Sequence, residues 1–218
     1  MPDLLDFFAG SGLVTEAVSE YFNVVWANDI CSKKQLVYEL NHGADHFHLG
    51  SIVDVNGTDV PTADLAWASF PCQDLSLAGN QAGLDGNRSG MFWEWLRVID
   101  EMEVTPPIIV LENVAGLVTG NQGQDYFILH GALKARGYRV GTLLLNAASW
   151  IPQSRERVFV VGVSAEFDLT EFERDSPNWA HPDRIKKVAK SIEDFVWWSL
   201  PEPPPRLQTL QDLIEVDA

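Results

Sequence analysis

Residues 1–163 alternate short apolar runs with longer segments in which apolar side chains recur at helical spacing. Short apolar runs bounded by turn residues are typical of strands, and the longer pattern is typical of amphipathic helices. We expect strands at residues 4–8, 24–27, 47–52, 64–68, 108–111, 138–146 and 157–163. We expect helices at residues 13–22, 32–41, 91–102 and 125–136. This alternation predicts a doubly wound, mostly parallel α/β sheet with a final antiparallel strand pair, and ligands at the carboxyl ends of its strands.

The character of the chain changes after Val163. Residues 164–218 are polar and rich in proline, and they include Trp197 and Trp198. We therefore expect a ligand-binding domain over residues 1–163 and a polar extension over residues 164–218. The two tryptophans could pack on the first domain or anchor a partner, and packing is the simpler interpretation.

Composition excludes several classes of protein. With 46% hydrophobic and 21% charged residues, the chain can bury a core and is not expected to be disordered. No apolar run approaches the roughly 18 residues that span a bilayer, and the start of the chain lacks the basic region of a secretory signal. Two cysteines, Cys31 and Cys72, cannot form a disulfide framework, so we expect a cytoplasmic protein.

A glycine-rich turn follows the first predicted strand. In the run Phe8-Ala9-Gly10-Ser11-Gly12, the glycines let the backbone approach a ligand closely. Asp29 ends the next strand, where a carboxylate can accept hydrogen bonds from ribose hydroxyls. The dinucleotide fingerprint is incomplete because position 15 is Thr15, so an adenosyl cofactor without phosphates fits better than NAD. A packing turn of any α/β protein would explain these residues about equally well.

Cys72 follows the predicted strand at residues 64–68. A single cysteine is usually a small buried hydrophobe, and we accept that interpretation for Cys31. Cys72 differs because the polar residues Gln73 and Ser76, with Gly79, surround it at a strand's carboxyl end. A nucleophilic role would require that nearby donors or cations stabilise its thiolate.

Charged side chains stand at two other strand ends. Glu112 ends the most apolar strand, beside the strand that leads to Cys72, where it could exchange a proton with a substrate ring nitrogen. Arg155 and Arg157 alternate along a strand, which puts both on one side, and guanidinium groups suit carbonyl or phosphate oxygens. A solvated carboxylate and ordinary surface ion pairs are the alternatives.

Five segments, taken in order, resemble the cytosine-5 DNA methyltransferase family. They are Phe8-Ala9-Gly10-x-Gly12, Asn28-Asp29, Pro71-Cys72-Gln73-x-x-Ser76, Glu112-Asn113-Val114 and Gln153-x-Arg155-x-Arg157. Each is weak alone, but their order and spacing make coincidence improbable. The resemblance covers residues 3–163 and implies a Rossmann-like, S-adenosylmethionine-dependent methyltransferase fold.

The resemblance also implies a reaction and its residues. Cys72 would attack C6 of a cytosine flipped out of double-stranded DNA, so that C5 can take a methyl group from S-adenosylmethionine. Glu112 would hold N3 and the exocyclic amine, and Arg157 would hold O2 with Arg155 nearby. A loop over the DNA would carry Gln73, Ser76, Gly79 and Arg88. No metal is implied.

The cofactor residues implied by the resemblance come from several segments. They are Phe8, Ala9, Gly10, Ser11, Gly12, Asp29, Ile30, Ser51, Ile52, Pro71 and Met91. Phe8 and Ile30 would contact adenine, and Asp29 the ribose. The family usually has aspartate, which contacts the adenine amine, where this chain has Ser51. A hydroxyl can still form a hydrogen bond, so we expect cofactor affinity to be lowered but not lost.

A larger departure concerns DNA recognition. After the arginine pair the family continues with a target-recognition domain and a last motif, whereas residues 201–214 resemble only the linker before recognition. We therefore expect a second polypeptide to supply both. With 15 basic and 31 acidic residues the formal charge is −16, so either that polypeptide is basic or Arg88, Arg155 and Arg157 gather on one face. A non-catalytic cofactor- or partner-binding remnant and a related RNA cytosine methyltransferase are the alternatives.

Overall fold

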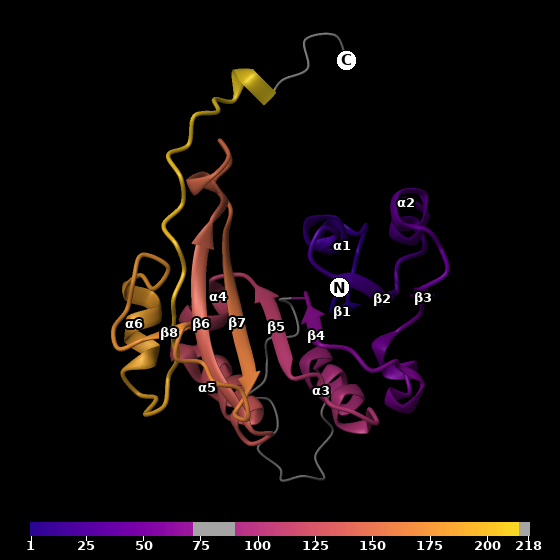
Figure 1. Cartoon of the computed structure of the whole chain (residues 1–218), viewed down its shortest axis with the longest axis horizontal. Helices are drawn as coiled ribbons and strands as arrows, with labels where there is room; N and C mark the ends of the chain where they lie inside the picture. Colours follow the sequence, from indigo (N-terminus) through magenta and orange to yellow (C-terminus); the bar gives the residue numbers. More distant parts are fainter. Residues whose placement is uncertain (72–89, 214–218) are drawn as a thin grey trace.

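A computed structural model describes residues 1–71 and 90–213, in which seven strands form one sheet. The strands are β1 (Asp3–Phe7), β2 (Asn23–Asp29), β3 (Phe47–Leu49), β4 (Leu65–Ala68), β5 (Ile108–Asn113), β6 (Tyr138–Asn146) and β7 (Glu156–Ser164). Their order across the sheet is β3-β2-β1-β4-β5-β7-β6 (Figure 1). The pairs from β3 to β5 are parallel, and β7 is antiparallel to both β5 and β6. The predicted mostly parallel sheet with a final antiparallel pair is confirmed.

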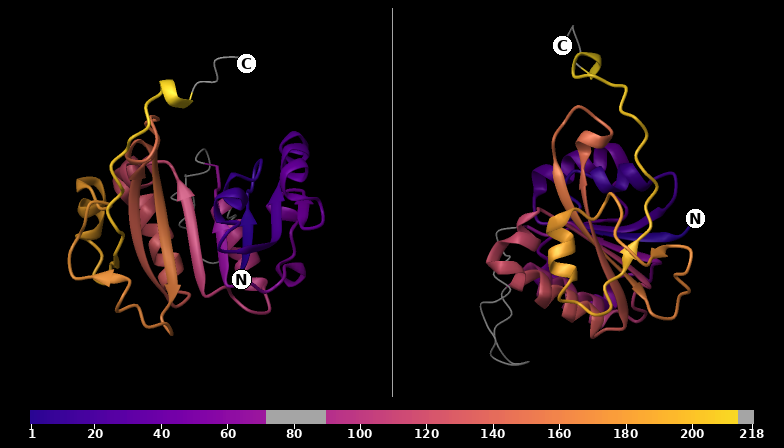
Figure 2. Two further views of the ribbon diagram at one scale, coloured as in Figure 1. Left: turned by 45° about the horizontal axis from the view of Figure 1, so that its top comes forward. Right: turned by 90° about the vertical axis from the view of Figure 1, so that its left-hand side faces the viewer.

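Helices lie on both faces of the sheet (Figure 2). They are α1 (Leu13–Val18), α2 (Ser32–His42), α3 (Met91–Glu101), α4 (Gly116–Thr119), α5 (Gln124–Lys134) and α6 (Asp183–Ala189). Short 3-10 helices are η1 (Ile52–Asp54), η2 (Gly57–Asp59), η5 (Gly120–Gly123), η6 (Ala147–Ser149) and η7 (Gln211–Leu213). A small antiparallel pair joins β8 (Glu173–Arg174) to β9 (Trp197–Trp198).

The core has a layer on each side of the sheet. Adjacent residues of a strand point to opposite faces, so Leu4 and Leu5 belong to different layers. Leu5 packs with Trp95 of α3 and Leu129 of α5, and all three are fully buried. Leu4 lies in a second cluster, against which Val18 of α1 packs. This doubly wound arrangement leaves the carboxyl ends of β1, β2, β4 and β5 at one edge of the sheet.

Two predicted elements extend three or four residues past the observed ones, for local reasons. The helix expected over residues 13–22 ends at Val18, and by Asn23 the main-chain amide already bonds the carbonyl of Pro2 to begin β2. The strand expected over residues 47–52 ends at Leu49. There the Ser51 side chain accepts a hydrogen bond from the amide of Val53 and starts η1.

The segment after β7 covers the outer strand of the sheet, β6. The amide of Leu144 donates to the carbonyl of Ala180 at 2.9 Å, and the amide of Val196 donates to the carbonyl of Val140 at 3.0 Å. The buried Trp198 packs with Ala180 and Val196 against this strand. Trp197 lies against the main core. The predicted packing of both tryptophans is therefore confirmed. The domain boundary after residue 163 stays a prediction.

The last described residues run alongside the β6–β7 hairpin and pass beyond its tip (Figure 1). There the Arg206 guanidinium donates to the carbonyls of Ala148 and Ile151, at 3.4 and 3.2 Å. Across residues 1–71 and 90–213, no helix has the length and apolar character needed to cross a membrane.

Candidate active site and cofactor pocket

The turn between β1 and α1 is built on left-handed backbone. Phe8, Gly10 and Gly12 have φ of 58°, 62° and 89°. The Asp29 carboxylate, at the end of β2, fixes this turn because it accepts the Gly10 amide at 3.0 Å and the Cys31 amide at 2.8 Å. The glycine-rich turn and the strand-end acid, which were predicted as separate parts of one site, therefore touch.

A pocket opens beside this turn. It is lined by Phe8, Asn28, Asp29, Ile30, Lys34, Gly50, Ser51, Ile52, Ser69, Pro71 and Met91. Phe8, Ile52 and Met91 give it apolar walls, and Asp29 and Ser51 provide polar atoms. The residues come from four strand ends, from the starts of α2 and η1, and from the start of α3. This is the edge of the sheet where α/β proteins bind ligands.

The pocket gathers seven of the eleven predicted cofactor residues. Those seven are Phe8, Asp29, Ile30, Ser51, Ile52, Pro71 and Met91. The other four, Ala9, Gly10, Ser11 and Gly12, belong to the adjoining turn but do not line the pocket. Cys72, Gln73, Ser76, Gly79 and Arg88 lie outside the described residues.

Sequence reasoning missed four lining residues, of which Asn28 and Lys34 make specific contacts. The Asn28 amide donates to the carbonyls of His48 and Gly50 at 2.8 and 3.0 Å, and so holds the opposite wall. The Lys34 ammonium lies 3.5 Å from the Asp29 carboxylate. Lys34 lies in the first turn of α2 and Asp29 ends β2, so the i,i+3 and i,i+4 spacings of a helix gave no indication of this contact.

A buried polar chain lies behind the turn. Asp6 is fully buried and accepts a hydrogen bond from the Thr15 hydroxyl at 3.0 Å. Thr15 contacts the Tyr38 hydroxyl at 2.9 Å, and Tyr38 in turn contacts His46 Nε2 at 2.9 Å. Burial raises the pKa of Asp6 to about 7, and the nearby negative charge of Asp29 adds to this shift.

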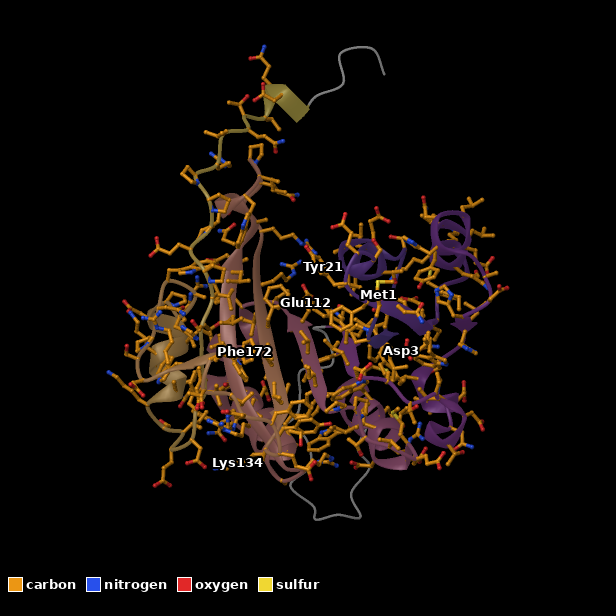
Figure 3. The ribbon with its side chains drawn as sticks, viewed as in Figure 1. Met1, Asp3, Tyr21, Glu112, Lys134 and Phe172 are labelled. Atoms are coloured by element: carbon orange, nitrogen blue, oxygen red, sulfur yellow. The ribbon has the colours of Figure 1, made fainter. Side chains whose placement is uncertain are left out.

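Glu112 and Arg157 form an ion pair between β5 and β7. Arg157 Nε lies 2.7 Å from Glu112 Oε1, and each side chain keeps 22% of its exposure. Figure 3 shows Glu112 near the carboxyl end of β5. The two residues that the resemblance assigns to the cytosine ring therefore meet. Arg155 precedes β7, and its side chain is exposed.

Asn113 ties this pair to the segment that leads to Cys72. Its buried side-chain amide donates to the carbonyl of Phe70 at 3.1 Å, and its Oδ1 accepts the amide of Val114 at 2.8 Å. Pro71, the next residue after Phe70, lines the pocket. The ion pair and the pocket are thus joined by one hydrogen bond, between Asn113, which follows Glu112, and Phe70, which precedes Pro71.

Comparison with known proteins agrees with this geometry. Residues 3–209 match the family described as C-5 cytosine-specific DNA methylase. The chain belongs to that family. It is 29% identical to the type II methyltransferase M.Bsp6I of Bacillus sp. (strain RFL6), an alignment that covers 99% of this chain and 61% of the relative. It is also 29% identical to the type II methyltransferase M.HhaI of Haemophilus parahaemolyticus, over 79% of this chain and 52% of that protein. The chain thus spans about half to three fifths of these family members.

Solved structures share the fold of this family member. The Dnmt2 methyltransferase of S. pombe superposes with a TM-score of 0.68 at 21% identity, over 100% of this chain and 62% of that one. A DNA modification methyltransferase from an E. coli prophage, described as putative, superposes with a TM-score of 0.61 at 19% identity, over 80% and 49%. The predicted Rossmann-like methyltransferase fold is confirmed.

Proposed function

We propose that this protein transfers a methyl group from S-adenosylmethionine to C5 of a cytosine flipped out of double-stranded DNA. The observation that carries the proposal is the Glu112–Arg157 pair, held beside the carbonyl of Phe70 by the buried Asn113. A carboxyl and a guanidinium group can together hold the N3, amine and O2 edge of cytosine, which has both donors and acceptors. Family membership supports the same chemistry.

The pocket residues suit an adenosyl cofactor. A carboxylate offers about four acceptor positions, and Asp29 uses three of them for Gly10, Cys31 and Lys34, which leaves one for a ribose hydroxyl. Phe8, Ile52 and Met91 supply apolar surface for a flat base. When bound, S-adenosylmethionine supplies an electrophilic methyl group.

In this proposal each protein group has one task. As cytosine enters between Glu112 and Arg157, the Glu112 carboxylate takes up a proton from solvent. The Cys72 thiolate then forms a bond to C6 while Glu112 donates that proton to N3, so that the displaced electron pair makes C5 nucleophilic. Arg157 holds O2 and favours the negative charge that develops on the ring. After methylation at C5, a base or water removes the C5 proton, the bond from Cys72 to C6 breaks, and N3 returns its proton to Glu112.

The test is covalent trapping. The protein is incubated with S-adenosylmethionine and a pool of random-sequence duplexes that contain 5-fluorocytosine, in which no C5 proton can leave. We expect a denaturation-resistant protein–DNA band that Cys72→Ala abolishes and the control Cys31→Ala retains. A band only with the corresponding RNA pool would indicate an RNA methyltransferase. No band with either pool, with or without a candidate basic partner, would indicate a non-catalytic remnant.

We also propose that a second, basic polypeptide supplies target recognition. The motivation is the formal charge of −16 and the neutralisation of Arg157 by Glu112. Proteins that hold DNA unaided usually need uncompensated basic groups. The measurement is methyl transfer from labelled S-adenosylmethionine to duplex DNA by this chain alone. Rapid, sequence-specific turnover without a partner would refute the two-chain arrangement.

A further inference from the structure

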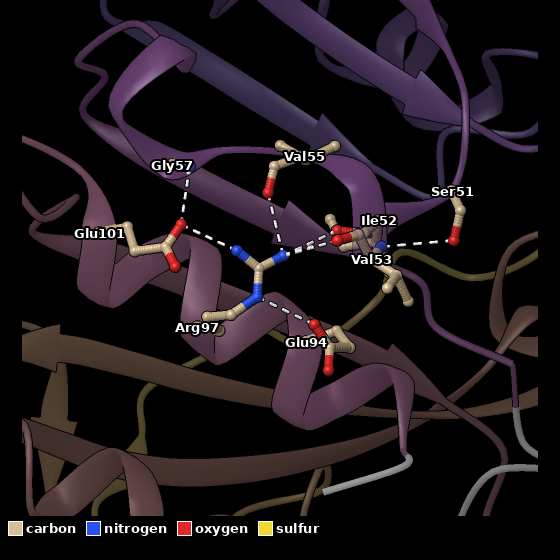
Figure 4. Close-up of polar contacts among 8 residues, drawn as sticks. All are labelled: Ser51, Ile52, Val53, Val55, Gly57, Glu94, Arg97 and Glu101. Atoms are coloured by element: carbon tan, nitrogen blue, oxygen red, sulfur yellow. Dashed lines mark hydrogen bonds and ion pairs between the residues drawn. The ribbon is translucent and has the colours of Figure 1, made fainter.

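Arg97, on α3, binds a segment that is distant in sequence. Its Nη2 donates to the main-chain carbonyls of Ile52, Val53 and Val55, at 3.1, 3.3 and 2.9 Å (Figure 4). These carbonyls belong to η1 and the residue after it, and the Ile52 carbonyl also accepts the Val55 amide at 3.2 Å. One side chain therefore binds three main-chain carbonyls around the end of η1.

Carboxylates on α3 hold the guanidinium in place. Arg97 Nε donates to Glu94 at 2.9 Å and Nη1 donates to Glu101 at 2.8 Å. Glu101 also accepts the amide of Gly57 at 3.0 Å, which gives the segment a second attachment to the helix (Figure 4). A side chain at Gly57 would come within 2.6 Å of Glu101 Cβ, so the segment lies directly on α3.

The attached segment is also a wall of the cofactor pocket. Ser51 and Ile52 line the pocket, and Ser51 is held by the hydrogen bond from the Val53 amide at 3.3 Å. Arg97 itself is not among the lining residues. Its contacts therefore act on the pocket only through the position of η1.

We propose that Arg97 is a positioning residue for the adenine end of the cofactor. By binding the carbonyls of η1, it sets where Ser51 and Ile52 stand opposite Phe8. Guanidinium geometry is needed for this, because one planar group must serve two carboxylates and a cluster of carbonyls at once. An ammonium group at the same position can satisfy only part of that set. The inference rests on the proposed use of an adenosyl cofactor.

The matched control is Arg136, near the end of α5. It too binds a carboxylate, with Nε 2.6 Å from Asp100, and a main-chain carbonyl, that of Ala132 at 2.8 Å. It does not line the pocket. Arg97→Lys and Arg136→Lys therefore remove comparable arginine contacts, and only the first disturbs the wall.

The experiment measures the dissociation constants of S-adenosylhomocysteine and 5′-methylthioadenosine by calorimetry, together with the Tm of each protein without ligand. For Arg97→Lys we expect both ligands to bind about tenfold more weakly, by the same factor, because both carry the adenosine that meets the wall. Arg136→Lys should bind both within about twofold of the parent protein at a comparable loss of Tm.

Three outcomes would overturn the inference. Unchanged binding by Arg97→Lys would mean that the wall does not depend on the guanidinium. An equal loss in both variants would mean that Arg97 acts only through general stability. Failure of the parent protein to bind either ligand would refute the proposed cofactor itself, and the inference with it, and is recognised before any variant is compared.

Discussion

At the scale of single residues, Asp6 stands out because a carboxyl group is fully buried beside the proposed cofactor site. One of its oxygens accepts from Thr15, and the other has no hydrogen-bond partner among the described residues. Burial penalises the charged form, so the pKa of Asp6 rises from its ordinary value of 3.8 to about 7. Between those two values the folded protein keeps a proton that the unfolded chain has lost.

This difference predicts a stability that falls as pH rises. Well below pH 3.8 Asp6 is protonated in both states and has no effect on stability. As pH rises through 7, ionisation of Asp6 stabilises mainly the unfolded state, and the free energy of unfolding falls by a total of about 4 kcal/mol. Chemical denaturation at several pH values between 4 and 8 would measure this slope. Asp6→Asn should flatten it, whereas the exposed control Asp183→Asn should leave it unchanged. An identical slope in the Asp6 variant would show that other groups are responsible.

Site residues at strand ends could be predicted from the sequence. Residues whose role depends on contacts with a distant segment could not. Phe8, Asp29 and Glu112 could be placed because a strand, its end and the next turn are readable from local pattern. Arg97 could not be identified as a support of the pocket wall, since the carbonyls that it binds lie more than forty positions away and have no sequence signature. Asp6 likewise gave no local indication that it would be fully buried.

At the scale of elements, the turn from β1 to α1 combines two different requirements for glycine. Gly10 and Gly12 both have positive φ. A side chain on Gly10 would approach nothing closer than Lys34 Cδ at 3.9 Å, but one on Gly12 would lie 2.5 Å from His42 Cδ2. Conformation alone restricts the first position, and conformation and packing against α2 restrict the second.

This difference predicts a graded response to substitution. Gly10→Ala should lower the free energy of unfolding by about 1 kcal/mol, the usual cost of a positive φ for alanine. Gly12→Ala should lower it by about 3 kcal/mol, because α2 must also move away from the turn. Urea denaturation without cofactor would measure both. Equal losses would indicate that His42 gives way freely.

At the scale of the whole molecule, the antiparallel pairing of β6 with β7 could be predicted, but the place of that pair in the sheet could not. Apolar periodicity locates β5, β6 and β7, yet it does not say which strand of the final pair lies beside β5. In the structure β7 enters between β5 and β6, which brings Arg157 to Glu112. The pairing of β5 with β7 depends on long-range contacts. The sequence therefore predicted that Glu112 and Arg157 share a role at the cytosine ring, but not that their side chains touch.

The covering of β6 leads to a prediction for truncated chains. A chain that ends after residue 164 would expose Leu143, Val163 and the β6 hydrogen-bonding groups now used by Ala180 and Val196. We expect it to lose cooperative thermal unfolding, because an apolar face and an open strand edge would meet water together. A chain that ends after residue 201 should keep the parent Tm within a few degrees, since residues 202–212 are exposed apart from the half-buried Pro203. A cooperative transition in the shorter chain would instead support an independent domain up to residue 163.

The two outer strands of the sheet also limit how this protein can associate with others. A bare strand edge invites a strand from another molecule, which is a common route to aggregation. Here one outer strand, β6, already shares backbone hydrogen bonds with Ala180 and Val196, and the other, β3, is only three residues long. Neither edge offers a long template for added strands. Partners are therefore expected to dock through side-chain surfaces, which allows an acidic chain to select a basic one by charge without sharing its sheet.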